Sequence, residues 1–197
     1  MQRIIVGITG ATGAIFGVRL LEALGAAGVE THLVLSRWGQ QTVEHETGLG
    51  IPELRKRASV VHGIANMAAT LSSGSFRTDG MVVAPCSMRT AAAIAHGFGD
   101  SLVHRAADVV LKERRKLVLV PRETPLSEVH LENLLKLARM GVTIVPPVPA
   151  FYNRPATVDD IVNHIVARVL DQFGIDSEFA RRWDGKMAHA GPVRRID

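Results

Sequence analysis

Residues 4–13 read Ile-Ile-Val-Gly-Ile-Thr-Gly-Ala-Thr-Gly, and this stretch decides the fold. The apolar run at 4–8 is typical of a buried β-strand, and Gly10 and Gly13 mark a tight turn after it. Residues 14–27 follow with Val18, Leu21 and Leu24 at helical spacing. A glycine-rich turn that leads into a helix leaves backbone N–H groups unpaired at the positive end of the helix dipole. The stretch therefore predicts a strand, a turn and a helix that together bind an anion.

The alternation of strand and helix patterns continues along most of the chain. The sequence predicts further strands at 29–35, 81–84, 117–120 and 142–145, and helices at 38–46, 65–71, 90–96, 103–115, 128–140 and 157–173. Short, wholly apolar strands between helices are typical of a parallel sheet covered on both faces. We therefore expect an α/β fold with one domain over residues 1–183, a three-layer Rossmann- or flavodoxin-like arrangement with a mostly parallel sheet. Residues 184–197 are expected to form a basic C-terminal tail.

Composition excludes several classes of protein. The chain has 197 residues, 47% of them hydrophobic, and no apolar run reaches the roughly 18 residues that span a bilayer. Cys86 is the only cysteine, which suits a reducing cytoplasm, and no signal peptide is recognisable. The net charge is +4, but aromatic residues make up only 5%, so we expect anionic small molecules rather than nucleic acid as ligands. The eight histidines show no zinc spacing, and no metal is expected.

Ligands of such sheets sit beyond the carboxyl ends of the strands. Segments 9–13, 36–38, 85–90, 121–125 and 146–152 follow the predicted strands and are rich in Gly, Pro, hydroxyl and basic residues. Ser36 and Ser87 offer hydroxyls there, and a flavin mononucleotide needs such donors for its phosphate and ribityl chain. Helix capping by the same two serines is the other interpretation that the sequence leaves open.

Two known nucleotide motifs are absent. No Gly-Lys-Ser/Thr follows the turn, so it is not a Walker loop. A short-chain nicotinamide reductase would need a Tyr with a Lys four residues later, and here Tyr152 is followed by Ala156. A phosphate leaving group needs several cations and a hydroxyl donor. Arg105 and Lys112 share one helix face and are candidates for that task.

Several longer motifs resemble one family. They are Ile-Val-Gly-Ile-Thr-Gly-Ala-Thr-Gly-Ala (5–14), Pro-Cys-Ser-Met-Arg-Thr (85–90), Arg-Ala-Ala-Asp-Val-Val-Leu-Lys-Glu (105–113), Leu-Val-Leu-Val-Pro-Arg-Glu-Thr-Pro-Leu (117–126), His-Leu-Glu-Asn-Leu (130–134) and Pro-Ala-Phe-Tyr (149–152). The chain resembles the UbiX-like flavin prenyltransferases over residues 3–183. Within them it is most similar to the small subunits that accompany bacterial hydroxyarylic (phenolic) acid decarboxylases.

The resemblance implies a metal-independent prenyltransferase. It would join a dimethylallyl group from dimethylallyl monophosphate to N5 and C6 of reduced FMN, and prenylated FMN would serve a UbiD-like decarboxylase. It also implies a homo-oligomer, a dodecamer, with active sites between subunits. The 1–183 unit would then be a flavoprotein domain.

The resemblance also assigns residues by their place in the motifs. FMN would be bound by Gly10, Ala11, Thr12, Ser36, Ser87, Met88, Arg89, Thr90 and Arg122. The prenyl phosphate would be held by Arg105, Lys112, Glu123, Tyr152 and Arg168, and Glu46 and Trp183 fall on further active-site positions. Thr12, Glu46, Lys112, Glu123 and Trp183 are expected to be catalytic. Glu123 would move a proton to and from the phosphate, and Glu46 and Thr12 would manage protons at the flavin.

Two other functions stay open from the sequence. A non-catalytic subunit that binds and delivers FMN would share the flavin site but would not need the phosphate-binding set. An FMN-dependent cysteine decarboxylase would carry a Pro-Ala-Ser-Ala-Asn-like loop where this chain has Pro-Cys-Ser-Met-Arg-Thr.

Overall fold

A single parallel sheet of six strands organises the protein, in the order β3-β2-β1-β4-β5-β6. The computed structural model describes residues 1–179, 183 and 185. The strands are β1 (Arg3–Ile8), β2 (Glu30–Leu35), β3 (Val60–His62), β4 (Gly80–Cys86), β5 (Lys116–Pro121) and β6 (Thr143–Ile144). Every neighbouring pair is parallel. The predicted α/β class and parallel sheet are therefore confirmed.

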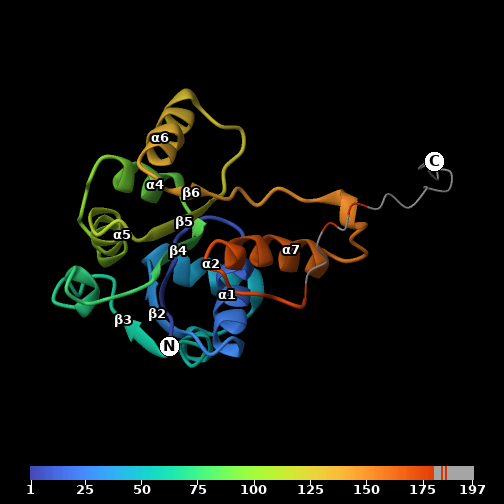
Figure 1. The fold of residues 1–197 in the computed structure, drawn as a ribbon, viewed down its shortest axis with the longest axis horizontal. Helices are drawn as coiled ribbons and strands as arrows, with labels where there is room; N and C mark the ends of the chain where they lie inside the picture. The colour runs from blue at the N-terminus through green and yellow to red at the C-terminus, as the bar shows by residue number, and fades with distance from the viewer. Residues whose placement is uncertain (180–182, 184, 186–197) are drawn as a thin grey trace.

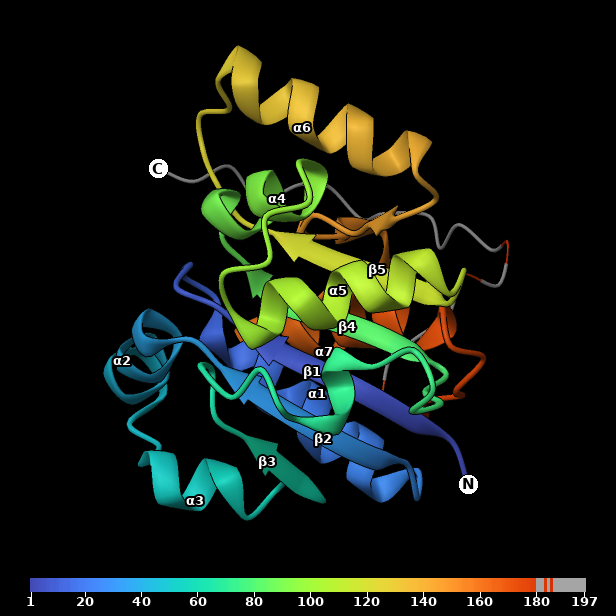
Figure 2. The ribbon, with the colours of Figure 1, turned by 90° about the vertical axis from the view of Figure 1, so that its left-hand side faces the viewer.

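Helices cover both faces of this sheet, as Figure 2 shows. They are α1 (Ala14–Ala26), α2 (Arg37–Thr47), α3 (Ile51–Arg55), α4 (Met88–Ala95), α5 (Leu102–Lys112), α6 (Glu128–Arg139) and α7 (Val158–Asp171), with short 3₁₀ turns η1 (Thr70–Ser72) and η2 (Phe151–Asn153). Helices α1 and α7 lie on one face and α5 on the other, while α6 packs on the outside of α4. None of the helices in the described part of the chain is long and apolar enough to cross a membrane.

Alternate residues of each strand supply two separate cores. From β1, Ile4, Val6 and Ile8 pack with α1 and α7, whereas Ile5 packs with α4 and α5. All four are at most 2% exposed. Burial on both faces explains why these strands are continuous apolar runs rather than alternating ones.

The structure differs from the secondary structure that the sequence predicts at two places. The predicted helix at 65–71 is wrong: those residues form turns that lead into η1. Strand β3 and helix α3 were not expected, since that stretch looked irregular around Pro52. The predicted cap of the last helix is confirmed, because Thr157 accepts from the Asp160 backbone and the Asp160 carboxylate accepts from the Thr157 backbone. The division at residue 183 stays a prediction, and the proposed tail lies outside the described residues except for Gly185.

Candidate functional site

A cavity of about 250 Å³ opens at the carboxyl ends of β1, β2 and β4, where the topology of the sheet predicts a ligand. Five of the expected FMN-binding residues line it: Gly10, Ser36, Ser87, Arg89 and Thr90. Thr9, Arg37, Trp38, Ile64, Ser101, Val103 and His104 complete the lining. Residues from five separate segments of the chain therefore meet at one pocket, which we call the strand-end pocket.

The side chain of Thr9 joins two walls of the strand-end pocket. Its Oγ1 donates to the carbonyl of Pro85 at 3.0 Å and accepts from the backbone N–H of Ser87 at 2.8 Å. Thr9 is only 2% exposed, so both hydrogen bonds are shielded from water. The end of β1 is thereby fixed against the Pro85–Thr90 loop.

Close packing explains why glycine stands at position 10. A Cβ built on Gly10 would lie 2.4 Å from the Cβ of Trp38, a distance that real atoms do not show. The turn after β1 therefore rests directly against the start of α2. Trp38 remains 68% exposed beside it and forms an open edge of the pocket.

The geometry of the pocket is compatible with both roles predicted for Ser36 and Ser87, helix capping and ligand binding. Ser36 Oγ accepts from the Gly39 N–H at 2.9 Å, and Ser87 Oγ accepts from the Thr90 N–H at 3.2 Å, so both serines are helix caps. A hydroxyl that accepts one hydrogen bond still carries a proton to donate. The Ser36 hydroxyl can therefore cap α2 and donate to a ligand, whereas the Ser87 hydroxyl also lies 3.1 Å from Thr90 Oγ1.

The expectation of open N–H groups at the start of α1 is wrong in part. The carboxylate of Glu46 accepts from the backbone N–H of Gly13 at 2.9 Å and of Ala14 at 2.8 Å. A charged side chain of the protein itself therefore occupies the positive end of the α1 dipole. Ala11 and Thr12 lie on the same turn, but neither they nor Met88 are among the residues that line the strand-end pocket.

Arg122 and Glu123 lie at the end of β5, beside the same loop. The backbone N–H of Arg122 donates to the carbonyl of Cys86 at 3.2 Å, and the side chains of Arg122 and Glu123 are both exposed. Cys86 is fully buried, and burial raises the pKa of its thiol to about 12. The thiol therefore stays protonated and is no nucleophile.

Arg105 and Lys112, the second group, are not among the residues that line the strand-end pocket. Helix α5 runs from the strand-end pocket towards the amino end of β5, a length of about 15 Å at 1.5 Å per residue. Arg105 donates to the Ser72 carbonyl, and Lys112 lies beside Gly74 and pairs with Glu113. The hydrogen bond and charge of Lys112 lower the pKa of Glu113. The two cations do share one face of α5, as their spacing predicts.

Tyr152, Arg168 and Trp183 belong to a third group. Figure 1 shows the chain between β6 and α7 extending away from the sheet to η2, which carries Tyr152. The Tyr152 ring contacts Trp183 edge-on at 5.6 Å, and its hydroxyl lies 3.4 Å from Nε2 of His164, one turn before Arg168 on α7. Desolvation, followed by the charge of Arg168, lowers the pKa of His164.

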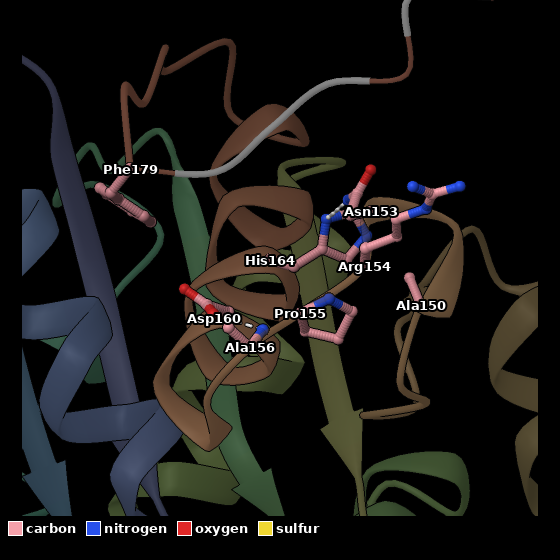
Figure 3. Close-up of a pocket in the computed structure, with 8 residues that line it drawn as sticks. All are labelled: Ala150, Asn153, Arg154, Pro155, Ala156, Asp160, His164 and Phe179. Atoms are coloured by element: carbon pink, nitrogen blue, oxygen red, sulfur yellow. Dashed lines mark hydrogen bonds between the residues drawn. The ribbon is translucent and has the colours of Figure 1, made fainter. Parts of the chain in front are cut away.

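A second cavity of about 300 Å³ is lined by His164, Asn153 and Asp160 among other residues (Figure 3). The amide nitrogen of Asn153 lies 3.0 Å from Nδ1 of His164 there, and Asp160 accepts from the backbone of Ala156 at 2.9 Å. Tyr152 and Arg168 do not line this cavity. The predicted phosphate-binding residues therefore do not line this cavity, although Tyr152 contacts its residue His164.

One chain thus provides three separate groups rather than one closed site. The strand-end pocket fits part of an FMN, because it combines hydroxyls, backbone donors and the cations Arg37 and Arg89. Its volume is below the roughly 300–1,000 Å³ of typical cofactor sites, so a single chain encloses only part of such a ligand. The described residues contain no cluster of three or more His, Cys, Asp or Glu that could hold a metal ion.

Sequence reasoning missed Thr9, Asp100 and His104. Thr9 could have been found, since it directly follows β1 in a segment already expected at the ligand edge. Asp100 lies just before α5, and His104 lies in its first turn. Polar residues are common at the start of a helix, so these two gave no sign of a ligand site. Only the packing of α5 across β2, β4 and β5 brings His104 to the pocket.

Comparison with known proteins agrees with this geometry. The family model described as Flavoprotein matches residues 1–170. A protein of Streptomyces sp. (strain D7) named probable UbiX-like flavin prenyltransferase is 64% identical over 194 residues, which cover 98% of this chain and 97% of that protein.

Two solved structures share the fold closely. The crystal structure of AnUbiX (PadA1) in complex with FMN and dimethylallyl pyrophosphate has a TM-score of 0.93 and 53% identity, covering 94% of this chain and 99% of that chain. The dodecameric FMN-dependent UbiX-like decarboxylase from Escherichia coli O157:H7 has a TM-score of 0.92 and 63% identity, covering 93% of this chain and 100% of that chain. The chain therefore belongs to the flavoprotein family and, within it, to the UbiX-like flavin prenyltransferases.

Proposed function

We propose that this enzyme transfers the dimethylallyl group of dimethylallyl monophosphate to N5 and C6 of reduced FMN, with release of phosphate. The observation that carries the proposal is the strand-end pocket, where Gly10, Ser36, Ser87, Arg89 and Thr90 line one cavity that fits part of an FMN. A relative that shares 53% identity over nearly the whole chain holds both FMN and a dimethylallyl phosphate ester, which supports the same pair of ligands here.

The proposed site is completed by neighbouring subunits. Lys112 lies at the end of α5 away from the strand-end pocket of the same chain, and Arg105 on the same helix does not line that pocket. Tyr152 lies on the arm that extends from the sheet (Figure 1), and Arg168 lies on α7. All four are half-buried or exposed, so they are available to a second copy. We propose a dodecamer, the assembly named for the relative from E. coli O157:H7.

Each group has a distinct task in this proposal. Arg105, Lys112, Arg168 and Tyr152 bind the phosphate and stabilise the charge that builds on its oxygens as the bond to the allylic carbon breaks. Glu123, exposed beside Arg122 at the end of β5, transfers the proton to and from that phosphate. Glu46 and Thr12 manage protons at the flavin, and Trp183 is a further active-site residue. Glu46 also holds the start of α1 in place.

The product, prenylated FMN, is proposed to serve a UbiD-like aromatic acid decarboxylase in the cytoplasm. Turnover of reduced FMN and dimethylallyl monophosphate by the isolated protein, without any decarboxylase, tests the catalytic proposal. A flavin-delivery subunit would leave the donor intact in that assay. The same assay with the diphosphate decides which ester is the donor.

A further inference from the structure

His104 is a buried imidazole in the wall of the strand-end pocket. It lies in the first turn of α5, is 8% exposed, and lines the pocket together with Thr9, Ser87 and Thr90. A polar ring so deeply buried needs hydrogen-bond partners on its nitrogens.

Asp100 fixes the orientation of this ring. Its Oδ1 lies 2.6 Å from Nδ1 of His104, and this contact is the main cause that lowers the pKa of Asp100. The carboxylate can only accept, so Nδ1 is the nitrogen that donates to Asp100, and in a ring with a single proton the lone pair lies on Nε2. Among the residues that the structure describes, none is within hydrogen-bond distance of Nε2.

Asp100 also reaches a second residue of the same wall. Its Oδ2 lies 3.9 Å from a guanidinium nitrogen of Arg89, which belongs to α4. The Arg89 side chain is 84% exposed, so this pair contributes little energy. Asp100 is thus placed to orient pocket residues on two helices, although it does not line the pocket itself.

We propose that His104 binds FMN directly, with Nε2 accepting a hydrogen bond from a donor of the flavin nucleotide, and that Asp100 is its positioning residue. Two kinds of donor belong to that ligand: the ring N3–H and the hydroxyls of the ribityl chain. This inference rests on FMN as the ligand of the proposed function and does not depend on prenyl transfer.

The test is a titration of flavin-free protein with FMN, followed by flavin fluorescence, for three variants. His104→Phe keeps the ring shape without nitrogen and is expected to weaken FMN binding about tenfold, the effect of one lost hydrogen bond of about 1.4 kcal/mol. His104→Gln keeps an acceptor near the place of Nε2 and should retain most of the affinity. His96→Phe is the matched control, because His96 bonds Asn133 away from the pocket and should leave FMN affinity unchanged.

The combined effect of Asp100 and His104 substitutions on FMN affinity distinguishes a positioning role of Asp100 from a purely structural one. In Asp100→Asn the side chain can also donate, so the proton of the His104 ring is no longer held on Nδ1. FMN binding should weaken several-fold. The double variant with His104→Phe should bind no more weakly than His104→Phe alone, which is the sign of one shared interaction. Additive losses would overturn the positioning role.

Lumiflavin, which lacks the ribityl phosphate, identifies the donor. An equal loss for lumiflavin and FMN in His104→Phe assigns the ring N3–H, and a loss for FMN alone assigns the ribityl hydroxyls. Unchanged FMN affinity in a folded His104→Phe, or an equal loss in His104→Gln, would overturn the proposal. Since no prenyl donor is present, this failure is distinct from a failure of prenyl transfer.

Discussion

The Glu46 carboxylate lies 2.8 Å from the backbone nitrogen of Ala14, so the end of α2 caps the start of α1. The same oxygen accepts from Gly13 at 2.9 Å. Two of the donors that a helix start leaves without partners are thereby satisfied, and the charge complements the helix dipole.

Removal of this cap should destabilise the protein. Glu46→Ala is expected to lower the free energy of unfolding by about 1–2 kcal/mol, because it removes both acceptors and the charge. Denaturant titration measures the loss, with Glu44→Ala on an exposed position of α2 as the control. Equal stability of the two variants would show that the contact contributes nothing.

Thr9 should be necessary for the shape of the strand-end pocket. Thr9→Val keeps the volume but leaves the Ser87 N–H and one bond to the Pro85 carbonyl without their partner. We expect a loss of about 1–3 kcal/mol in stability and weaker FMN binding. Thr42→Val, at a half-buried position on α2, should change neither quantity. Parent-like FMN affinity in Thr9→Val would contradict the role of Thr9.

A side chain at position 10 should not be tolerated. In Gly10→Ala the new Cβ would meet Trp38 at 2.4 Å, so the turn or the start of α2 must move, at a cost of about 1–3 kcal/mol. Gly99→Ala is the matched control, because open space surrounds Gly99. Thermal unfolding and FMN affinity of both variants test this expectation, which fails if Gly10→Ala behaves like Gly99→Ala.

Acid should weaken the fold through Glu30. Hydrogen bonds from Arg3 and His32 lower the pKa of Glu30 to about 2, below the value of roughly 4.3 in unfolded chains. The stabilisation is therefore complete above about pH 4.5 and is lost as the pH falls through 2. In Glu30→Gln, stability should depend less on pH between those values. Parallel stability curves of parent and variant over that range would refute the assignment.

Subunit mixing tests whether active sites are shared. Lys112→Ala and Arg122→Ala should each abolish prenyl transfer, since one removes a phosphate contact and the other a flavin contact. If Lys112 serves the pocket of another chain, oligomers reassembled from both inactive variants contain some intact sites and regain activity. A mixture no more active than its two components would place all these residues in the site of one chain.

Much of the fold follows from local pattern, and the exceptions have physical reasons. Wholly buried strands such as β1 and β4 read as apolar runs, so they were predicted. Strand β3 was missed, because Val60 and Val61 are each 38% exposed at the sheet edge and the strand has only three residues. The helix expected at 65–71 does not form, since the Ile64 carbonyl accepts from Leu102 and the Asn66 side chain bonds the Ala68 N–H. Tertiary contacts thus override the helix propensity of an alanine-rich segment.

Only the site residues that directly follow a strand in the sequence could be predicted to lie together. Gly10, Ser36, Ser87, Arg89 and Thr90 were expected together and do line one pocket. The contact of Glu46 with Gly13 depends on how α2 packs against α1, which no local pattern encodes. For the same reason, the distance between Lys112 and the pocket became visible only when the direction of α5 was known.

The most direct test of prenyl transfer is mass spectrometry of the flavin released after anaerobic incubation of the protein with reduced FMN and dimethylallyl monophosphate. The account predicts a flavin heavier by one five-carbon unit, with release of phosphate and no need for a decarboxylase. Recovery of unmodified FMN and intact donor, from both the monophosphate and the diphosphate, would contradict it.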